Sequence, residues 1–430
     1  MKEINPDNTV FAILCFEGPD LYASAGGLSV RISELARALA EEGYTTHLFF
    51  VGDPHKPAEE KLVNDKFILH RWCQWISHYH MAGVYQAEDE KLWDYERSLP
   101  PYLIENVIKP AVSQKKLVVI LGEEWHTTST VINLHEMLKS SGLRDKVLMF
   151  WNANNVFSFW RINWGKLQEA STITTISRYM KHYMWDMGLD PLVIPNGIPS
   201  RLLEKVNLLR VKKLRSIWEG ETMLVKVGRY DPDKRWVMAI EAVAELKKQK
   251  MKPHMLMRGG MEAHRADVMA RAKDLGLSIY ELSVTHPSFE TIIEALQNVK
   301  NHDLIELRFF VPEDFLRLMY AAADAVLANS GREPFGLVGL EVMATGGIAF
   351  TGNTGEDYAQ SFSNAVVLDT DDAREIATYL EALEAHPEEK ERLRENARAT
   401  AGSYVWQEVI KELLRKIEFN IMIKGIKIKK

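Results

Sequence analysis

Cysteine is nearly absent from the sequence, which has two among its 430 residues, Cys15 and Cys73. Two cysteines exclude a disulfide framework and give no metal-ligand spacing, as is typical of a reducing cytosol. No hydrophobic run reaches the length of a membrane span. The first residues carry Asn, Pro and Asp where a signal peptide would carry positive charge. We therefore expect a soluble, cytoplasmic protein.

The chain also lacks an excess of charge of either sign. Its 53 basic and 59 acidic residues give a formal net charge of -6, which does not indicate nucleic acid or a bulk membrane surface as a partner. A small-molecule ligand is the default expectation. With 46% hydrophobic residues, a chain of this length is too long for one ordinary core and long enough for two.

Short apolar runs alternate with longer amphipathic segments, a pattern that predicts β-α-β units and a parallel sheet. In the first half, a helical pattern at 27–43 lies among runs that predict strands at 9–17, 46–52, 116–122, 146–152, 172–177 and 191–197. After residue 199 the alternation restarts. There a helical pattern at 234–249 lies among runs that predict strands at 222–229, 253–260, 324–330 and 347–353.

This pattern predicts the α/β class, with two Rossmann-like, doubly wound parallel-sheet domains facing each other across a cleft. We place an N-terminal domain at 1–198 and a C-terminal domain at 199–402. The remaining segment, 403–430, contains a predicted helix at 404–419 and a basic tail. We expect that helix to pack on one domain or across both.

Ligands of such folds bind beyond the carboxyl ends of the strands, so the turns at those ends are the candidate sites. In the first half, Gly26 and Gly27 precede a helix and let backbone amides approach an anion, although paired glycines also form ordinary turns. The pattern is not G-x-G-x-x-G, which disfavours a nicotinamide dinucleotide. His126, just beyond a predicted strand, either contacts a substrate or is satisfied by neighbouring backbone.

Four charged side chains mark the strand ends of the second half. Arg229 and Lys234 lie five apart across a turn, which suits a diphosphate, although single surface cations are common. In GREPFGLVGLEVMATGG (331–347), Glu333 lies in a loop and Glu341 in the helix that follows. Buried carboxylates need hydrogen-bond donors, so we expect sugar hydroxyls of a ligand or nearby amides to supply them.

The spacing E-P-F-G-L-x-x-L-E resembles the E-x7-E signature of retaining family-4-type glycosyltransferases, which have the GT-B fold and bind a nucleotide-sugar. The resemblance covers nearly the whole chain. The segments 24–44, 123–128, 193–199 and 227–236 are similar to the family's glycine loop, its histidine segment, its interdomain link and its diphosphate-binding turn. It implies an acceptor-side N-terminal domain and a donor-binding C-terminal domain.

Carried over position by position, the resemblance implies a donor site made of both domains. Arg229 and Lys234 would bind the diphosphate, which Gly26 and Gly27 would approach from the other domain. Glu341 would hold the ribose. No metal or other cofactor would be required, because the cationic side chains and a helix dipole take the charge that Mg²⁺ carries elsewhere.

The transferred sugar would be held by Glu333 and by the backbone of the next loop residues, with His126 near its reacting end. The loop residues are Phe335, Gly336 and Leu337. The expected catalytic residues are Glu333, His126, Arg229 and Lys234. The implied reaction moves a hexosyl group from a nucleoside diphosphate-sugar to a carbohydrate or other hydroxyl acceptor with retention of configuration.

Three rival functions share these residues. A nucleotide-sugar epimerase or a phosphorylase of the same fold would isomerise the donor or cleave with phosphate, and neither would transfer a sugar to an added acceptor. A non-catalytic sugar-nucleotide sensor would bind the donor tightly without slow hydrolysis.

Several positions depart from the family pattern. Ser and Ala at 24–25 replace the Lys-Thr of glycogen synthases, which disfavours a glucan synthase, and Arg235 follows Lys234 where the family usually has glycine. WNANN replaces the common His-Asn. Its Asn154 and Asn155 either bind acceptor hydroxyls or cap a turn.

Acceptor recognition is expected in the N-terminal half, in the aromatic-rich segment 70–103. Trp75 can stack on a sugar face, and His78 and His80 can donate to hydroxyls; the alternative is an aromatic patch that packs an inserted element. Two basic stretches, 201–218 and 421–430, would touch anionic lipid if the acceptor is lipid-linked, although a solvated helix and a frayed tail are the simpler interpretation.

Overall fold

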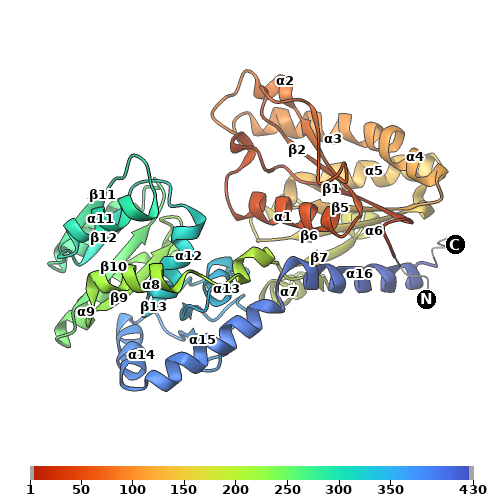
Figure 1. Ribbon diagram of the computed structural model, residues 1–430. Coiled ribbons are helices and arrows are strands. Elements are labelled where there is room, and N and C mark those ends of the chain that lie inside the picture. The colour runs from red at the N-terminus through yellow and green to blue at the C-terminus, as the bar shows by residue number, and fades with distance from the viewer. Residues whose placement is uncertain (1–3, 426–430) are drawn as a thin grey trace. The chain divides into compact units, whose positions relative to one another are not determined.

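The computed structural model describes residues 4–425. The chain forms two compact units, one from residues up to Gly197 together with those from Trp406 onward, and one from Ile198 to Val405. Each unit is a β-sheet with helices packed on it (Figure 1). The predicted α/β class with two doubly wound domains is confirmed.

The first unit is built on an eight-stranded sheet with the order β3-β4-β2-β1-β5-β6-β7-β8. Its strand pairs are parallel except for β3 with β4. Its strands are β1 (Thr9–Leu14), β2 (Thr45–Val51), β3 (Glu59–Leu62), β4 (Phe67–Trp72), β5 (Leu117–Glu123), β6 (Val147–Ala153), β7 (Thr172–Thr175) and β8 (Leu192–Val193). Six follow predicted apolar runs, whereas β3 and β4 were not predicted.

Helices cover this sheet, and one of them is irregular. Pro100 and Pro101 lie inside α3, which passes into a π-helical stretch at Ile104–Ile108. Proline has no backbone N–H to donate, so it interrupts the regular hydrogen-bond ladder of a helix. The helices of the unit are α1 (Gly27–Glu41), α2 (Gln74–Ser77), α3 (Glu88–Leu103), α4 (Lys109–Ser113), α5 (Thr128–Ser140), α6 (Trp164–Ala170), α7 (Arg178–Trp185) and α16 (Trp406–Ile423).

The last helix, α16, belongs to the first unit although it follows the second in the chain. Figure 1 shows α16, in blue, alongside the red to yellow elements of this unit, and it packs against α1. Trp406, Leu413 and Ile417 are buried in the same core as β1. A Cβ atom on Gly197 would come within 2.5 Å of the Trp406 ring. Glycine at this position therefore lets the tryptophan lie against the backbone.

The second unit is built on a seven-stranded parallel sheet with the order β11-β12-β10-β9-β13-β14-β15. Its strands are β9 (Thr222–Val227), β10 (Pro253–Arg258), β11 (Ile279–Leu282), β12 (Leu304–Leu307), β13 (Ala325–Ala328), β14 (Ala349–Thr351) and β15 (Val366–Val367). Its helices are α8 (Leu208–Arg215), α9 (Trp236–Lys248), α10 (Arg265–Asp274), α11 (Phe289–Val299), α12 (Glu313–Ala322), α13 (Leu337–Ala344), α14 (Ala373–Ala385) and α15 (Pro387–Gly402).

The basic stretch at 201–218 is not one continuous helix. It begins in a 3-10 turn at Ser200–Leu203, and Asn207 then starts α8 by accepting hydrogen bonds from the amides of Leu209 and Arg210. An asparagine in this role satisfies amides that have no partner within a helix. Of the other basic stretch, 421–430, the residues after 425 lie outside the described part of the chain.

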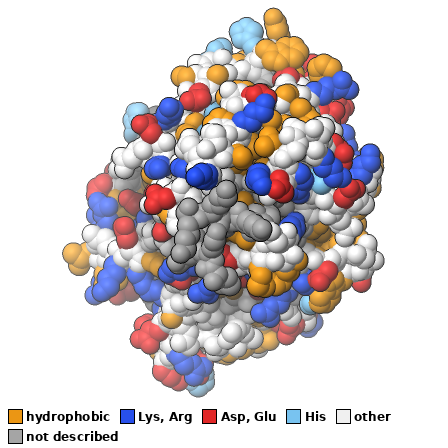
Figure 2. Space-filling model, turned by 90° about the vertical axis from the view of Figure 1, so that its right-hand side faces the viewer, with side chains coloured by type: hydrophobic (Ala, Val, Ile, Leu, Met, Phe, Trp, Pro, Cys, Tyr) orange, Lys and Arg blue, Asp and Glu red, His pale blue; other side chains and the backbone are white. Residues whose placement is uncertain are grey.

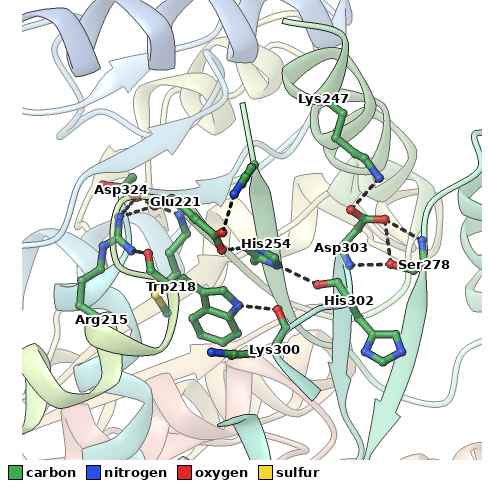
Figure 3. A network of polar contacts seen from close by, with 12 residues as sticks. Arg215, Trp218, Glu221, Lys247, His254, Ser278, Lys300, His302, Asp303 and Asp324 are labelled. Atoms are coloured by element: carbon green, nitrogen blue, oxygen red, sulfur yellow. Dashed lines mark hydrogen bonds and ion pairs between the residues drawn. The ribbon is translucent and has the colours of Figure 1, made fainter. Parts of the chain in front are cut away.

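A polar network ties together the amino ends of the second sheet (Figure 3). His254, at the start of β10, contacts Glu221 Oε2 through Nε2 at 2.8 Å and the carbonyl of His302 through Nδ1 at 2.9 Å. Asp303, before β12, accepts from Lys247 Nζ at 2.7 Å. These polar groups are paired within the protein, so they serve the architecture of the sheet.

The surface offers no field of a single sign on the face drawn in Figure 2, where Lys and Arg side chains are interspersed with Asp and Glu. Within residues 4–425, no helix combines the length and the apolar character that crossing a bilayer requires.

Candidate active site

The candidate residues follow strands at which each sheet reverses its order. In the first sheet this point lies between β1 and β5, which are neighbours, and in the second between β9 and β13. Gly26 and Gly27 follow β1, and His126 follows β5. Such topological switch points open a crevice beyond the carboxyl ends of the strands. Each unit therefore presents its candidate residues at the edge where ligands of this fold class bind.

In the second unit, Lys234 and Glu333 meet. The loop after β9 makes a 3-10 turn at Pro232–Lys234, which Asp231 starts by accepting from the amide of Asp233. The Lys234 ammonium forms an ion pair with the Glu333 carboxylate. The lysine side chain is 30% exposed and the glutamate 15%. Both groups are therefore accessible to a ligand while each holds the other in place.

Arg235 has the backbone conformation that explains why glycine is common here in the family it resembles. Its φ is +49°, in the left-handed region that favours glycine. Its guanidinium forms an ion pair with Asp371. Arg235 thus takes a strained backbone position and directs its charge to a carboxylate of its own unit.

A second acid, Glu356, lies under the loop that carries Glu333. The Thr354 hydroxyl donates to the carbonyl of Glu333 at 3.1 Å, and the Thr354 amide donates to Glu356 Oε2 at 3.1 Å. Burial, followed by the charge of Glu333, raises the pKa of Glu356 to about 7. Sequence analysis did not identify Glu356. The only signal for it in the sequence is its position directly after the small and polar residues 351–355.

The helix α13 begins at Leu337, directly after the loop. Phe335 is buried and packs 5.7 Å from the Tyr358 ring, measured between centroids. Gly336 has φ +80°, and its carbonyl accepts from the Tyr358 hydroxyl. This conformation favours glycine. The first backbone amides of α13, as in any α-helix, have no acceptor within the helix.

Glu341 lies in the middle of α13, and its carboxylate has no hydrogen-bond or ion-pair partner among the described residues. Desolvation is the main cause that raises the pKa of Glu341 to about 7. Glu313 raises it further, and Arg201 opposes the shift. A desolvated carboxylate without donors is the arrangement expected where a ligand supplies them.

Two more cations lie at this edge. Arg229 is exposed, and within the described chain its guanidinium makes no ion pair. Lys226, on β9, is buried and donates to the carbonyl of Leu327 at 3.1 Å and to the side chain of Asn329 at 2.5 Å. Burial, followed by the nearby Lys234, lowers the pKa of Lys226 well below its usual value. Sequence analysis missed Lys226 because it lies inside an apolar strand.

In the first unit, the glycine pair stands at the start of α1. Gly26 precedes the helix and Gly27 is its first residue, and neither would bring a Cβ atom within 4 Å of another group. Glu17 accepts from the amides of Ala25 at 3.3 Å and Ser29 at 3.2 Å. Glu17 therefore caps the first turn, while the space around both glycines stays open.

His126 is held between aromatic rings. Its ring stacks on Phe16 at 4.6 Å and on Trp125 at 3.9 Å, and its Nε2 lies 2.9 Å from Glu88 Oε1. Burial is the main cause that lowers the pKa of His126, although Glu88 opposes it. Its Nδ1 is buried and has no partner in residues 4–425. The imidazole is thus fixed in place with one nitrogen still able to bond.

The neighbouring acids Glu123 and Glu124 have opposite environments. Glu123 pairs with Arg31 at 2.7 Å and accepts from Asn154 Nδ2 at 2.8 Å. Burial raises the pKa of Glu124 to about 8, although the Asn154 amide donates to it. Asn155 Oδ1 accepts from the amide of Phe157 at 2.7 Å, which is a turn-capping contact. The structure therefore engages both asparagines within the protein.

Both halves of the chain match glycosyltransferase families. Residues 25–201 match the family "Glycosyltransferase Family 4", and residues 212–400 match "Glycosyl transferases group 1". The chain is a family-4-type GT-B glycosyltransferase.

Similar proteins are distant in sequence. The glycosyltransferase is 22% identical over 342 residues to N-acetyl-alpha-D-glucosaminyl L-malate synthase of Bacillus anthracis, covering 76% of each chain. Its fold matches sucrose-phosphate synthase from Thermosynechococcus elongatus with a TM-score of 0.66 and 16% identity, over 96% of this chain and 100% of the other. It also matches Anabaena HepE in complex with UDP-glucose, with a TM-score of 0.61 and 14% identity, over 96% and 99% of the chains.

The candidate acceptor residues of the glycosyltransferase are not among those that line the hollow at its glycine loop. Trp75 and His78 are exposed, and His80 lies 3.9 Å from Glu90. The hollow has a volume of about 550 Å³, and residues 81–86 of the aromatic-rich segment line it, with Tyr85 among them. Its lining is Leu21, Tyr22, Ser24, Ala25, Asp53, His55, Met81, Ala82, Gly83, Val84, Tyr85 and Gln86.

Proposed function

We propose that this glycosyltransferase moves a hexosyl group from a nucleoside diphosphate-sugar to an acceptor hydroxyl, with retention of anomeric configuration and without a metal ion. The observation that carries the proposal is the contact between Lys234 and Glu333 at the switch point of the second sheet. It combines a cation for a phosphate with a carboxylate for sugar hydroxyls at one place.

The leaving diphosphate would be stabilised by Lys234 and Arg229. Arg229 offers a guanidinium without a carboxylate partner in the described chain, and such a group suits bidentate binding of phosphate oxygens. Donors already aimed at the developing charge lower the barrier because they need no rearrangement during the reaction. These two cations would also take the charge that a metal ion takes in other enzymes, which supports metal independence.

The sugar and ribose would complete the hydrogen bonding of two carboxylates. Glu333 pairs with Lys234 and can accept from hydroxyls of the transferred sugar. Glu341 lacks a donor in the described residues, and a vicinal diol such as that of ribose presents two hydroxyls at the required spacing. The open first turn of α13 would add backbone amides for the sugar or phosphate.

His126 would orient the sugar as a neutral imidazole. Its lowered pKa keeps it uncharged at neutral pH, and its Glu88 contact occupies Nε2, so the buried Nδ1 is the ring nitrogen without a partner in the described chain. We propose that the leaving diphosphate oxygen takes the proton of the attacking hydroxyl on the same face of the sugar, so that no carboxylate nucleophile is needed.

The test is turnover with a panel of uridine, adenosine and guanosine diphosphate-sugars. We expect slow release of nucleoside diphosphate without acceptor and faster release with one, unchanged by EDTA. Proton NMR of the product reports the anomeric configuration. Tight donor binding without release would indicate a sensor, and isomerised donor or phosphate-dependent cleavage would indicate an epimerase or phosphorylase; any of these results would overturn the proposal.

A further inference from the structure

A second hollow lies at the opposite edge of the first sheet from the glycine loop. Its volume is about 700 Å³. The residues around it come from α5 and α6, from the segment before β6 and from the residues that follow α16. They are His135, Arg144, Asp145, Lys146, Glu169, Lys424 and Gly425. The hollow belongs to the first unit alone, and none of its lining residues takes part in the proposed transfer.

Two cations in this hollow have no carboxylate partner among residues 4–425. Arg144 donates to the carbonyls of Val147 and Ala170, each at 2.8 Å, and Lys424 Nζ donates to the Thr172 hydroxyl at 3.1 Å. Lys424 is exposed as a residue, but its ammonium packs among other groups. This desolvation, followed by the charge of Arg144, lowers the pKa of Lys424. Two like charges close enough to affect each other are stabilised by an anion.

The acids of the hollow do not fill that role. Asp145 pairs with Lys146 at 2.5 Å, and Glu169 pairs with Lys139 at 2.6 Å. Each of these carboxylates already has a lysine of its own. The charges of Arg144 and Lys424 are therefore the ones left for a ligand.

His135 adds a donor. It is 4% exposed, and its Nε2 has no hydrogen-bond partner in the described chain. Arg144 Nε donates to Nδ1 at 2.8 Å, so the neutral ring carries its hydrogen on Nε2. That nitrogen lies 3.7 Å from Glu136 Oε1 and 4.0 Å from Glu169 Oε1, at the wall of the hollow.

The same tautomer disfavours a metal ion. His135, Glu136 and Glu169 bring possible ligand atoms within 4.8 Å of one another. A metal ion would need a free lone pair on Nε2, but the Arg144 contact at Nδ1 places the ring hydrogen on Nε2. A metal ion would also have to displace Lys139 from Glu169. The hollow is better suited to a group that accepts hydrogen bonds.

We propose that Arg144, Lys424 and His135 in this hollow bind a phosphate-bearing anion at a site separate from the donor site. Phosphate oxygens accept from guanidinium, ammonium and imidazole N–H groups, which are the donors present here. This inference does not depend on the proposed transfer reaction.

The phosphate has two possible sources, free in solution or in a phospholipid headgroup. The last turns of α16, next to Lys424, expose the apolar side chains of Phe419, Met422 and Ile423. An apolar border beside a phosphate site is compatible with lipid, whereas a free anion needs no such border. Both sources require the same cations, so one set of variants tests the site and separate probes distinguish the sources.

The first experiment titrates the full-length protein with inorganic phosphate and pyrophosphate by isothermal titration calorimetry. Lys234→Ala serves as background, because it removes a cation from the donor site. In that background, Lys424→Gln and Lys146→Gln remove cations of the hollow. Lys411→Gln is the matched control, since Lys411 lies on α16, which Lys424 follows, pairs with Glu408 and does not line the hollow. Thermal unfolding confirms that each variant is folded.

The second experiment measures co-sedimentation of the same variants with vesicles of phosphatidylcholine, with or without phosphatidic acid. We expect binding of at least one phosphate probe to survive Lys234→Ala and to weaken about tenfold or more in Lys424→Gln, but not in Lys411→Gln. Dependence on Lys424 only with phosphatidic acid vesicles identifies a lipid source.

Three results would overturn the proposal. Lys424→Gln and Lys411→Gln could behave alike with every probe. Lys234→Ala could abolish all phosphate binding, which would leave only the donor site. Zn²⁺ could bind through His135, as shown by its loss in His135→Ala, with no binding of phosphate. Failure of the transfer reaction is detected separately, by turnover.

Discussion

The ammonium of Lys234 and the carboxylate of Glu333 form an ion pair although 99 residues separate them in the chain. They come from the loops after β9 and β13, which are neighbouring strands of one sheet. Adjacent parallel strands end at the same edge, so the fold brings together two groups that chemistry can use jointly.

Lys234→Ala should lower turnover about a hundredfold or more, because a preorganised donor to the leaving group is lost. The melting temperature should stay close to that of the wild type, since both side chains are partly exposed. Lys248→Ala, which removes an exposed lysine paired with Glu245 on α9, is the control and should leave turnover unchanged. Near-normal turnover in Lys234→Ala would refute the assignment.

Above pH 7, Glu341→Gln should raise KM for the donor about tenfold, because an ionised acceptor for two hydroxyls becomes a weaker one. The pKa of Glu341 is about 7 against an ordinary 4.5, so burial penalises its charge. Protonated Glu341 adds to the free energy of unfolding below about pH 4.5, and this contribution is lost as the pH rises to about 7. Above pH 7 the variant should therefore melt no lower than the wild type. Glu294→Gln, an exposed change on α11, is the control, and an unchanged donor KM in Glu341→Gln would contradict the ribose role.

His126→Phe separates packing from chemistry. Phenylalanine keeps a ring between Phe16 and Trp125 but cannot hydrogen-bond, so the variant should fold and its turnover should drop about a hundredfold. Glu88→Gln keeps a hydrogen-bonding group beside Nε2 and should have a smaller effect. If His126→Phe turns over like the wild type, His126 is a packing residue.

Gly26→Ala should affect the ligand and not the fold. The φ of Gly26 is -176°, which any residue adopts, and the added methyl would meet no atom within 4 Å. We expect an unchanged melting temperature and about a tenfold higher donor KM, since the methyl stands where an anion would approach the amides. Gly355→Ala is the contrasting control, because its Cβ would fall 2.2 Å from the carbonyl oxygen of Glu333 and should lower the melting temperature. Normal donor kinetics in Gly26→Ala would leave the glycine pair as an ordinary turn.

Glu123→Gln and Glu124→Gln should differ although the residues are adjacent. Glu123→Gln leaves the buried Arg31 without its counter-charge and should cost about 3–5 kcal/mol of folding free energy. Glu124 has a pKa of about 8 against 4.5, so its contribution to stability is lost as pH rises between these values. Glu124→Gln should therefore gain stability relative to the wild type from pH 5 to pH 8, measured by urea unfolding. A constant difference across this range would show that Glu124 is ionised in the folded protein.

Strands with uniformly apolar sequences were predictable, whereas β12, which carries a buried charge, was not. All six residues of β1 are buried, and its apolar run predicts it directly. In β12, Glu306 is also buried, but Arg265 from α10 pairs with it at 2.5 Å and Tyr230 donates to it at 2.8 Å. Because those partners are distant in sequence, a local pattern could not show that a charged residue belongs inside the sheet.

The same limit applies to the candidate site. Spacing predicted the turn with Lys234, the loop with Glu333 and the helix with Glu341, since proline and glycine fix local conformation. The contact of His126 with Glu88 spans 38 residues, and the contact of Asn154 with Glu123 spans 31. The contacts of His126 and Asn154 could not be predicted from the sequence, because the packing of separate elements determines their partners.

The return of α16 to the first unit has a consequence for synthesis. Trp406 and Ile417 are part of the core that also holds β1, yet the ribosome makes them only after the whole of Ile198–Val405. The first unit is therefore completed only after the second has been made, and until α16 is synthesised part of the apolar interior of the first unit stays uncovered.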